Sequence, residues 1–197
     1  MSVKLDGVKE TIRAIRKIDP ELLKEMNKEI KGFMIPIRDK ARGYAPTAAP
    51  GGLYNWDEQT YATRVVKPRE TAGRKFPLYQ AESVRKGIYY SAAASKRNKN
   101  GWSSQYIVAN ASASGAIYET AGRKNPGGSS RSRSNNPGAG SNFISRMGPL
   151  YGQTQASRGR MIFRAWAEDQ GKAQAAVVKA IEKTIAAFNQ GRYDKAA

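Results

Sequence analysis

The sequence contains neither cysteine nor histidine. Without cysteine the chain can form no disulfide, no thiolate nucleophile and no zinc site that needs sulfur. Without histidine it lacks the usual general base of a Ser or Cys triad and the commonest metal ligand. Catalysis would have to rest on carboxylates, Lys, Tyr or Arg. The two absences therefore favour a protein with no active site, no cofactor and no metal.

Acidic residues are scarce, because 16 Asp and Glu oppose 34 Lys and Arg and the formal charge is +18. The excess is uneven. The segment Asp6 to Asp39 carries seven acids among its basic residues, whereas Gly122 to Arg160 carries none. The seven basic residues of that second segment are Arg123, Lys124, Arg131, Arg133, Arg146, Arg158 and Arg160. Such a stretch favours a polyanionic or acidic partner over a small neutral ligand.

Long apolar runs are also missing, since no stretch approaches the roughly 18 apolar residues that a membrane span needs. Charges are scattered through Met1 to Pro20, where a signal peptide would have an apolar core. We therefore expect a protein that is made and kept in the cytosol, with no membrane partner, unless something larger carries it out. The length of 197 residues suits one domain.

Helical spacing of apolar residues predicts three helices. Leu5, Val8, Ile12 and Ile15 indicate a first helix over residues 6–17. Asp19 as N-cap and Pro20 as first helical residue start a second helix, which should run through Pro36 with a kink and end near Gly43. Its predicted buried stripe is Leu22, Leu23, Met26, Ile30, Phe33, Met34, Ile37 and Ala41. A terminal helix is expected over 172–190, after an apolar segment, 161–166, that could be a strand end or a helical lead-in.

The strongest β signal is a hairpin. Residues 88–94 and 102–110 are the two strands, and Asn98 to Gly101 supply the turn. Residues 45–86 contain many Pro and Gly breakers and read as an irregular excursion with one candidate strand at 61–66. A short helical turn is expected over 114–120, and then a low-complexity loop over 122–142 that stays mobile until bound. The fold class is α+β, with N-terminal helices, an antiparallel hairpin or small sheet, a C-terminal helix and long basic loops.

The carboxylates carry no catalytic pattern. Glu168 and Asp169 read as a helix start, and Glu119 is expected to pair with Arg123 one turn later. The glycines of 127–140 lack the flanking strand and helix of a phosphate-binding loop.

Aromatic residues of the hairpin lie beside basic ones, namely Tyr89, Tyr90, Trp102 and Tyr106 beside Lys96, Arg97 and Lys99. They could stack nucleic-acid bases, but cross-strand packing with a solvated turn is the favoured interpretation. The Arg-Ser run at 131–134 could hold phosphates or keep a loop soluble, and these two readings stay open.

Several short motifs resemble the tail-completion family of long-tailed bacteriophages. Leu5-Asp6-Gly7-Val8 precedes a long helix that leads to Ala45-Pro46-Thr47, although Gly51-Gly52-Leu53 follows only after an insertion. Ala116-Ile117-Tyr118-Glu119 with Gly122 is similar to the family's Ala-x-x-x-Glu-Phe-Gly turn, with Thr120-Ala121 as a departure. Ile162-Phe163-Arg164-Ala165 resembles its Pro-Phe-x-x-Ala segment without the proline.

The resemblance implies a single α+β domain over 1–197, with irregular insertions at about 47–86 and 123–158. It implies no enzyme activity and a structural role in the virion. In that role, a ring, commonly hexameric, joins the capsid connector to the tail tube. The implied partners are other copies of the chain, other neck and tail-tube proteins, and packaged DNA.

Two sets of residues are predicted to make these contacts. Partner-facing or DNA-facing positions are Arg123, Lys124, Arg131, Arg133, Lys96, Arg97 and Lys99. The subunit interface is predicted at Val177, Ile181, Ile185, Phe188, Trp102 and Tyr106, because the apolar faces of the hairpin and terminal helix exceed what a small sheet can cover. The alternative function is a sequence-nonspecific nucleic-acid-binding protein.

Overall fold

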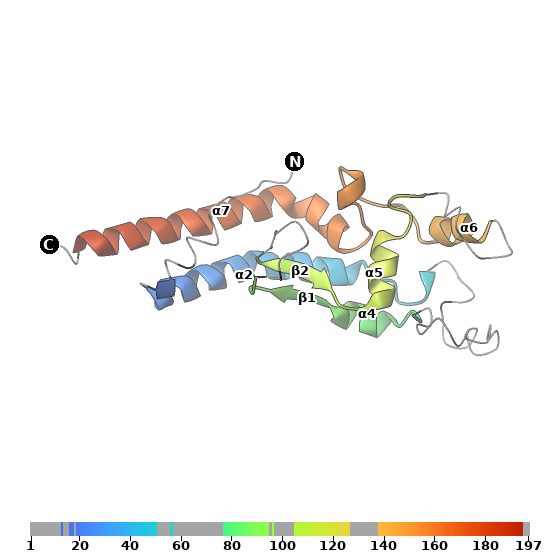
Figure 1. Ribbon diagram of the computed structural model, residues 1–197, viewed down its shortest axis with the longest axis horizontal. Helices are drawn as coiled ribbons and strands as arrows, with labels where there is room; N and C mark the ends of the chain where they lie inside the picture. Colours follow the sequence, from blue (N-terminus) through green and yellow to red (C-terminus); the bar gives the residue numbers. More distant parts are fainter. Residues whose placement is uncertain are drawn as a thin grey trace. The chain divides into compact units, whose positions relative to one another are not determined.

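The computed structural model describes residues 13, 16, 17, 19–50, 56, 77–94, 96, 105–126 and 138–194. In chain order these form α2 (Pro20–Gly43), α4 (Ala81–Gly87), β1 (Ile88–Ser91), β2 (Ile107–Asn110), α5 (Ala113–Thr120), α6 (Ala139–Arg146), the 3-10 turn η2 (Gln155–Ser157) and α7 (Ile162–Asp194), as Figure 1 shows. The predicted α+β class is confirmed, with a long first helix, a two-stranded antiparallel hairpin and a long C-terminal helix that packs on the first.

The chain divides into two compact units, each built from distant segments. Unit 1 comprises residues 1–36, 91–107 and 169–197, and unit 2 comprises residues 37–90 and 108–168. The predicted helix over 6–17 lies largely outside the described residues, although positions 13, 16 and 17 are helical. The candidate strand at 61–66 and the hairpin turn at 98–101 lie outside them altogether.

Helix α2 begins and ends where the sequence predicts. The backbone N–H of Leu22 donates to the Asp19 carboxylate at 3.0 Å, as an N-cap should. The helix continues through Pro36 to Gly43. The buried residues of the stripe are Leu23, Met26, Ile30, Met34, Ile37 and Ala41. Phe33 is a correction, because its side chain is 45% exposed. Neighbouring residues on a helix point in different directions, so Met34 takes the core and Phe33 does not.

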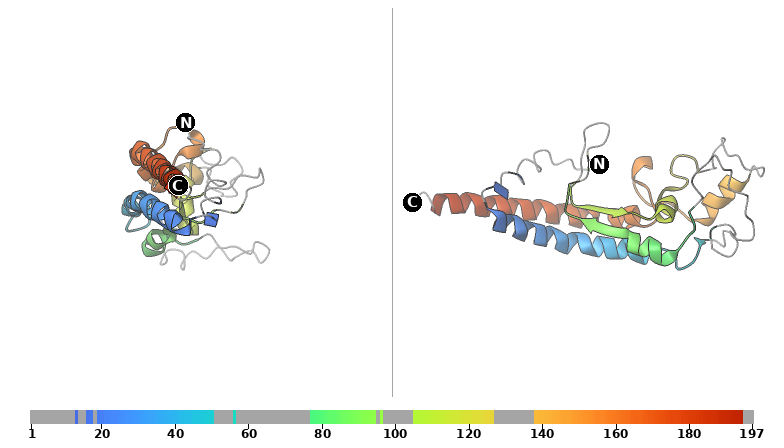
Figure 2. Two further views of the ribbon diagram at one scale, coloured as in Figure 1. Left: turned by 90° about the vertical axis from the view of Figure 1, so that its left-hand side faces the viewer. Right: turned by 60° about the horizontal axis from the view of Figure 1, so that its bottom comes forward.

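Helix α7 begins at Ile162 rather than near residue 172, so the segment 161–166 is a helical lead-in. The prediction that Glu168 and Asp169 start a helix is wrong, because both lie inside α7. In unit 1, small side chains of α7 are buried, namely Ala173, Ala180 and Thr184. Here the first part of α2 runs beside and antiparallel to the last part of α7 (Figure 2).

The core of unit 2 includes an aromatic cluster. The ring of Trp56 lies 5.2 Å from that of Tyr79 and 5.1 Å from that of Phe143, between ring centroids. The indole N–H of Trp56 donates to the Pro77 carbonyl at 2.9 Å, and the Tyr79 hydroxyl donates to the Pro46 carbonyl at 2.8 Å. Tyr79 also contacts Tyr118 edge to face, with 6.4 Å between the ring centroids. Segments on both sides of the 57–76 stretch are thereby joined.

Two short helices in unit 2 differ from what the sequence predicts. Helix α4 lies in the stretch read as an irregular excursion, and α6 overlaps the end of the predicted loop over 122–142. Isolated helices of this length are unstable in water, so tertiary packing must support them. Val84 of α4 is fully buried, and Phe143 of α6 packs on Trp56.

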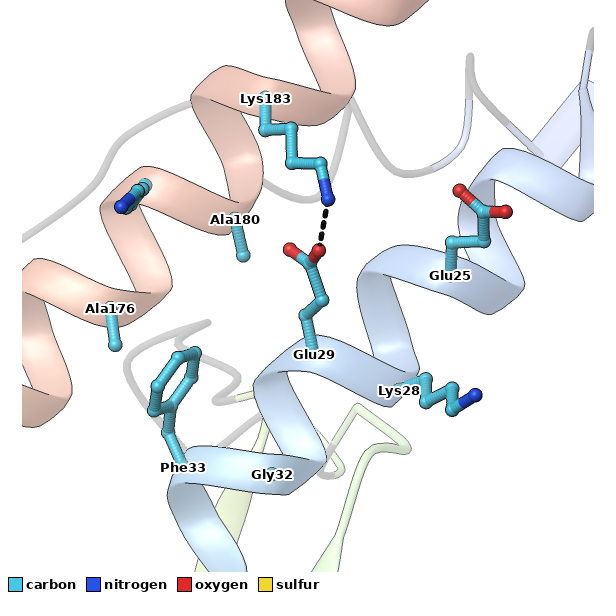
Figure 3. Close-up of a pocket in the computed structure, with 9 residues that line it drawn as sticks. Glu25, Lys28, Glu29, Gly32, Phe33, Ala176, Ala180 and Lys183 are labelled. Atoms are coloured by element: carbon cyan, nitrogen blue, oxygen red, sulfur yellow. Dashed lines mark hydrogen bonds and ion pairs between the residues drawn. The ribbon is translucent and has the colours of Figure 1, made fainter.

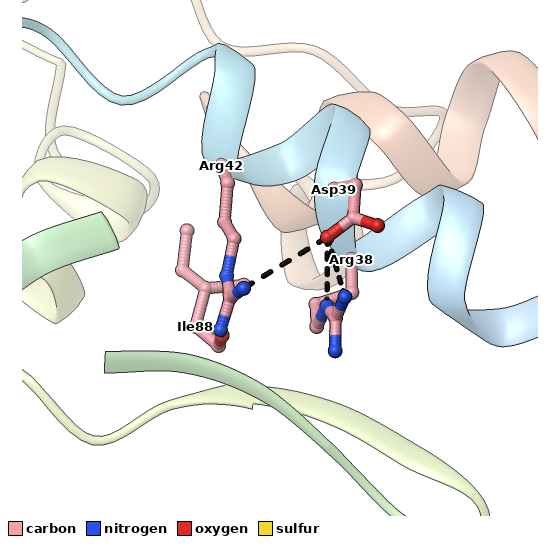
Figure 4. Close-up of polar contacts among 4 residues, drawn as sticks. All are labelled: Arg38, Asp39, Arg42 and Ile88. Carbon is pink, nitrogen blue, oxygen red and sulfur yellow. Dashed lines mark hydrogen bonds and ion pairs between the residues drawn. The ribbon is translucent and has the colours of Figure 1, made fainter. Parts of the chain in front are cut away.

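The hairpin is shorter than predicted, because neither residues 92–94 nor 105–106 are strand. Tyr106 has a φ of 55°, a left-handed conformation that interrupts a strand. Strand β1 is held to α2 by Arg42, whose guanidinium donates to the Ile88 carbonyl from Nε at 2.9 Å and Nη2 at 2.6 Å. Figure 4 shows this contact beside Asp39, which also accepts from Arg38.

Candidate functional site

Glu119, the acid of the Ala-x-x-x-Glu segment, holds the start of α7. One carboxylate oxygen accepts the Met161 N–H at 2.7 Å and the other accepts the Phe163 N–H at 2.8 Å. The first backbone amides of a helix have no acceptor within the helix, and its N-terminus carries partial positive charge. A buried carboxylate from α5 therefore satisfies both the hydrogen bonding and the charge of this helix end.

The Glu119–Arg123 ion pair expected from the sequence is replaced by these amide contacts. Burial raises the pKa of Glu119 above its usual value, while the amides of Phe163, Met161 and Ile162 and the charge of Arg123 act in the opposite direction. The Arg123 guanidinium itself lies over the ring of Phe163, 4.5 Å from its centroid. Both oxygens of Glu119 bond to backbone, which is the arrangement of a structural carboxylate.

Arg160 performs the corresponding task at the end of α5. Its Nη1 donates to the carbonyls of Tyr118 at 2.8 Å and Ala121 at 2.9 Å, and its Nε donates to the Gly148 carbonyl at 3.0 Å. The side chain is buried, and burial lowers the pKa of the guanidinium while Tyr118 and Glu119 raise it. Since α5 caps α7 and a residue just before α7 caps α5, we call Glu119 and Arg160 the reciprocal clamp.

Glycines allow the reciprocal clamp to close. A Cβ on Gly159 would collide with a carboxylate oxygen of Glu119, so this position has room only for hydrogen. Gly122 has a φ of +81°, in the left-handed region that favours glycine. Glycine is therefore favoured at position 122 by the backbone conformation, and at position 159 by the lack of space for a side chain.

Next to the reciprocal clamp, Arg164 lies between two tyrosine rings. Its guanidinium carbon is 3.9 Å from the Tyr44 ring centroid and 4.3 Å from that of Tyr151. Glu168 accepts from Arg164 at 3.2 Å, from the Tyr44 hydroxyl at 2.6 Å and from Lys40 at 2.8 Å. Lys40 and Tyr44, with Arg164, lower the pKa of Glu168 to about 2. This cluster joins the last turns of α2 to the first turns of α7.

The predicted partner-facing residues are only partly described. Arg123 is half-buried against Phe163, whereas Lys124 and Lys96 are exposed. The backbone carbonyl of Lys124 accepts from Gln155 at 3.5 Å. Arg131, Arg133, Arg97 and Lys99 lie outside the described residues.

The predicted subunit-interface residues differ in their exposure. Tyr106 is buried within its own chain and donates from its hydroxyl to Asn27 at 2.8 Å. Little of its side chain is therefore left exposed for a neighbouring subunit. Ile185 is 40% exposed. Val177, Ile181 and Phe188 are half-buried, and Trp102 lies outside the described residues.

A surface groove in unit 1 was not anticipated. It has a volume of about 840 Å³ and lies between α2 and α7. Its lining residues are Glu25, Lys28, Glu29, Gly32, Phe33, Ala176, Lys179, Ala180 and Lys183. Figure 3 shows Glu29 and Lys183 reaching toward each other from the two helices, and Phe33 beside them. The only sequence signal was the spacing of Glu21, Glu25 and Glu29 on one face of α2.

Two further features were sought in the parts of the chain that the structure describes, a metal-binding cluster and a membrane-spanning helix. No three acidic side chains gather there as metal ligands would. Of the helices among those residues, none combines the length and apolar character needed to cross a membrane.

Comparisons with known proteins assign the chain to no family and no fold. The chain matches no protein-family model, no curated protein and no solved structure. Any functional conclusion therefore depends on the residues of this chain and their geometry.

Proposed function

We propose that this protein is a structural subunit of a bacteriophage neck, which forms a ring that joins the capsid connector to the tail tube. The observation that supports this most is the reciprocal clamp. Two of the short segments that resemble the tail-completion family, 116–122 and 162–165, are distant in sequence and meet there. Chance matches to short motifs have no reason to share one junction.

Three residues of these segments have a physical task at the junction. Glu119 is needed as an acceptor for the amides of α7, and Gly122 for its left-handed backbone. Ala165 is completely buried, so a larger side chain would not fit. The third segment, Ala45-Pro46, is not part of this junction, and its carbonyls bind elsewhere in unit 2, since Ala45 accepts from Arg85 at 3.4 Å and Pro46 accepts from Tyr79.

The proposed mechanism is geometric. The helices and the hairpin would form the body of each ring segment, and basic loops would contact acidic neighbours or the DNA that passes through. With a formal charge of +18, the chain is suited to polyanionic surroundings. The proposed partners are further copies of the chain, other neck proteins and the tail tube, in a virion assembled in the host cytoplasm.

Particle assembly tests this proposal directly. Without the protein, full heads and free tails should accumulate, and joined particles should return when the wild-type chain is supplied. Electron microscopy counts the joined particles, and a gold label on the chain should lie at the neck. Normal joining in its absence, or a label elsewhere in the particle, contradicts the proposal.

The high positive charge favours one second candidate, a sequence-nonspecific nucleic-acid-binding protein. That protein would bind DNA as a monomer or dimer, with an affinity that falls steeply as salt rises. A neck subunit should instead form an oligomer alone or on meeting its partner. Sedimentation with and without DNA distinguishes the two candidates.

A further inference from the structure

The groove in unit 1 combines an exposed aromatic ring with charged side chains on both of its walls. Phe33 is 45% exposed there, whereas aliphatic neighbours on α2 are buried. Glu29 is paired with Lys183. Among the described residues, Glu25 and Lys179 form no ion pair, although both line the groove. An exposed aromatic ring beside such charges is typical of a protein contact surface.

The two walls of the groove have opposite character. The α2 wall presents Glu25 and Glu29 with Lys28, so acidic residues outnumber basic ones there, and the α7 wall presents only basic charged residues, Lys179 and Lys183. The lining as a whole has two acidic and three basic residues, against 16 and 34 in the full sequence. The groove is therefore a nearly neutral surface on a strongly basic protein.

That composition identifies the occupant. Two chains of charge +18 repel each other, and the repulsion is weakest where nearly neutral surfaces meet. A groove whose two walls carry opposite net charge is complementary to itself when rotated by a two-fold axis. An acidic or a basic partner would match only one of the walls, whereas a second copy matches both.

We propose that the groove of unit 1 binds the groove of a second copy of this chain in a two-fold contact. Glu25 of each copy faces Lys179 of the other, and Phe33 of each packs against Ala176 of the other. The inference goes beyond the proposed function, because the subunits of a ring contact each other head to tail, whereas a two-fold contact joins two copies through the same surface. A two-fold contact pairs subunits and leaves a different surface to close the ring.

Charge reversal tests the contact. Glu25→Lys alone would bring two ammonium groups together at each facing pair, and Lys179→Glu alone would bring two carboxylates together. Each variant should weaken self-association by about tenfold or more, as measured by sedimentation over a concentration series. An equimolar mixture of the two variants should restore association. In a mixed pair of copies the lysine introduced at position 25 faces the glutamate introduced at position 179, and the unchanged Lys179 faces the unchanged Glu25, so both facing pairs are again of opposite charge.

The double variant completes the charge-reversal test. A chain that carries both Glu25→Lys and Lys179→Glu presents opposite charges at every facing pair, with the two signs exchanged. It should associate about as well as wild type, within roughly threefold. Single variants that associate like wild type, or a double variant no better than either single one, would overturn the proposal.

Two further variants separate the groove from general effects. Phe33→Ala removes the exposed ring and should also weaken the pair by about tenfold. Glu82→Lys on α4 makes the same charge change at an exposed position outside the groove, and it should associate like wild type. A wild-type chain that stays monomeric at every concentration overturns the inference. The proposed function fails separately, when the protein is absent from the neck of the particles.

Discussion

At the scale of single residues, the buried carboxylate of Glu119 is the most consequential side chain of unit 2. It accepts from the Met161 and Phe163 amides, and its position is fixed by the close approach of Gly159. A carboxylate that meets two backbone donors at a helix start contributes more than an exposed cap, because water cannot replace it. The start of α7 therefore depends on a residue of α5.

Replacing Glu119 should destabilise the fold strongly. Glu119→Ala leaves two buried amides without acceptors, and we expect a loss of about 3 kcal/mol in the free energy of unfolding. Glu119→Gln retains one acceptor and should lose roughly half as much. Urea denaturation measures both. Glu82→Ala, at an exposed ion pair on α4, is the control and should change stability by less than about 0.5 kcal/mol. A loss equally small for Glu119→Ala would contradict the capping role.

Two glycines should respond to alanine with opposite signs. Gly159→Ala places a methyl group against the Glu119 carboxylate and should cost about 1–3 kcal/mol. Gly171 lies inside α7 with open space around it. Alanine at position 171 should stabilise the protein by about 0.5–1 kcal/mol, because it favours the helix. Thermal unfolding of both variants gives the two signs, and a gain for Gly159→Ala would refute the steric argument.

At the scale of elements, the contact of α2 with α7 in unit 2 depends on a charged cluster at the surface. Arg164 stacks between Tyr44 and Tyr151, and Glu168 collects three donors from the two helices. Tyr151 is positioned by paired backbone hydrogen bonds with Gly159 at 2.9 Å each. Planar stacking of this kind requires arginine, since lysine has no flat face to place between two rings.

Acid should weaken this helix contact through Glu168. Its pKa is lowered from 4.5 to about 2 in the folded protein, so its contribution is complete above pH 4.5 and is lost as the pH falls through about 2. Wild type should therefore lose stability faster than Glu168→Gln over that interval. Tyr44→Phe keeps the ring for Arg164 but removes one donor, and it should fall between them. Unfolding curves across this pH range provide the measurement, and equal slopes for all three proteins would exclude the role of Glu168.

At the scale of the whole molecule, positive charge sets the conditions under which copies can meet. The charge of +18 opposes self-association, and salt screens this repulsion over a Debye length of about 8 Å at physiological ionic strength. Contacts with DNA depend on released counterions and weaken as salt rises.

Salt should therefore separate the two kinds of contact. Between about 50 and 200 mM salt, DNA binding should fall by several orders of magnitude, while association of copies is retained. Sedimentation of the protein with and without DNA across a salt series measures both. Oligomers that dissociate as the salt concentration rises would show that charge pairs, and not the apolar part of the contact, dominate the interface.

The sequence by itself determined the features whose causes lie within a few residues. The Asp19 cap, the end of α2 at Gly43 and the spacing of Met26, Ile30 and Met34 follow from capping chemistry and helical period. The existence of the hairpin follows from its β-forming residues. Charge counts also anticipated the basic middle of the chain, though not the tasks of Arg123 and Arg160 within it.

Only the tertiary structure decided the features whose partners are distant. Glu119 and the Met161 amide are 42 positions apart, and Arg160 reaches the Tyr118 carbonyl over the same separation. No local pattern identifies such an acceptor, because α5 meets α7 only when the chain is folded. The exposure of Phe33 has the same origin, since periodicity places it near the core face and only the packed position of α7 leaves it in an open groove.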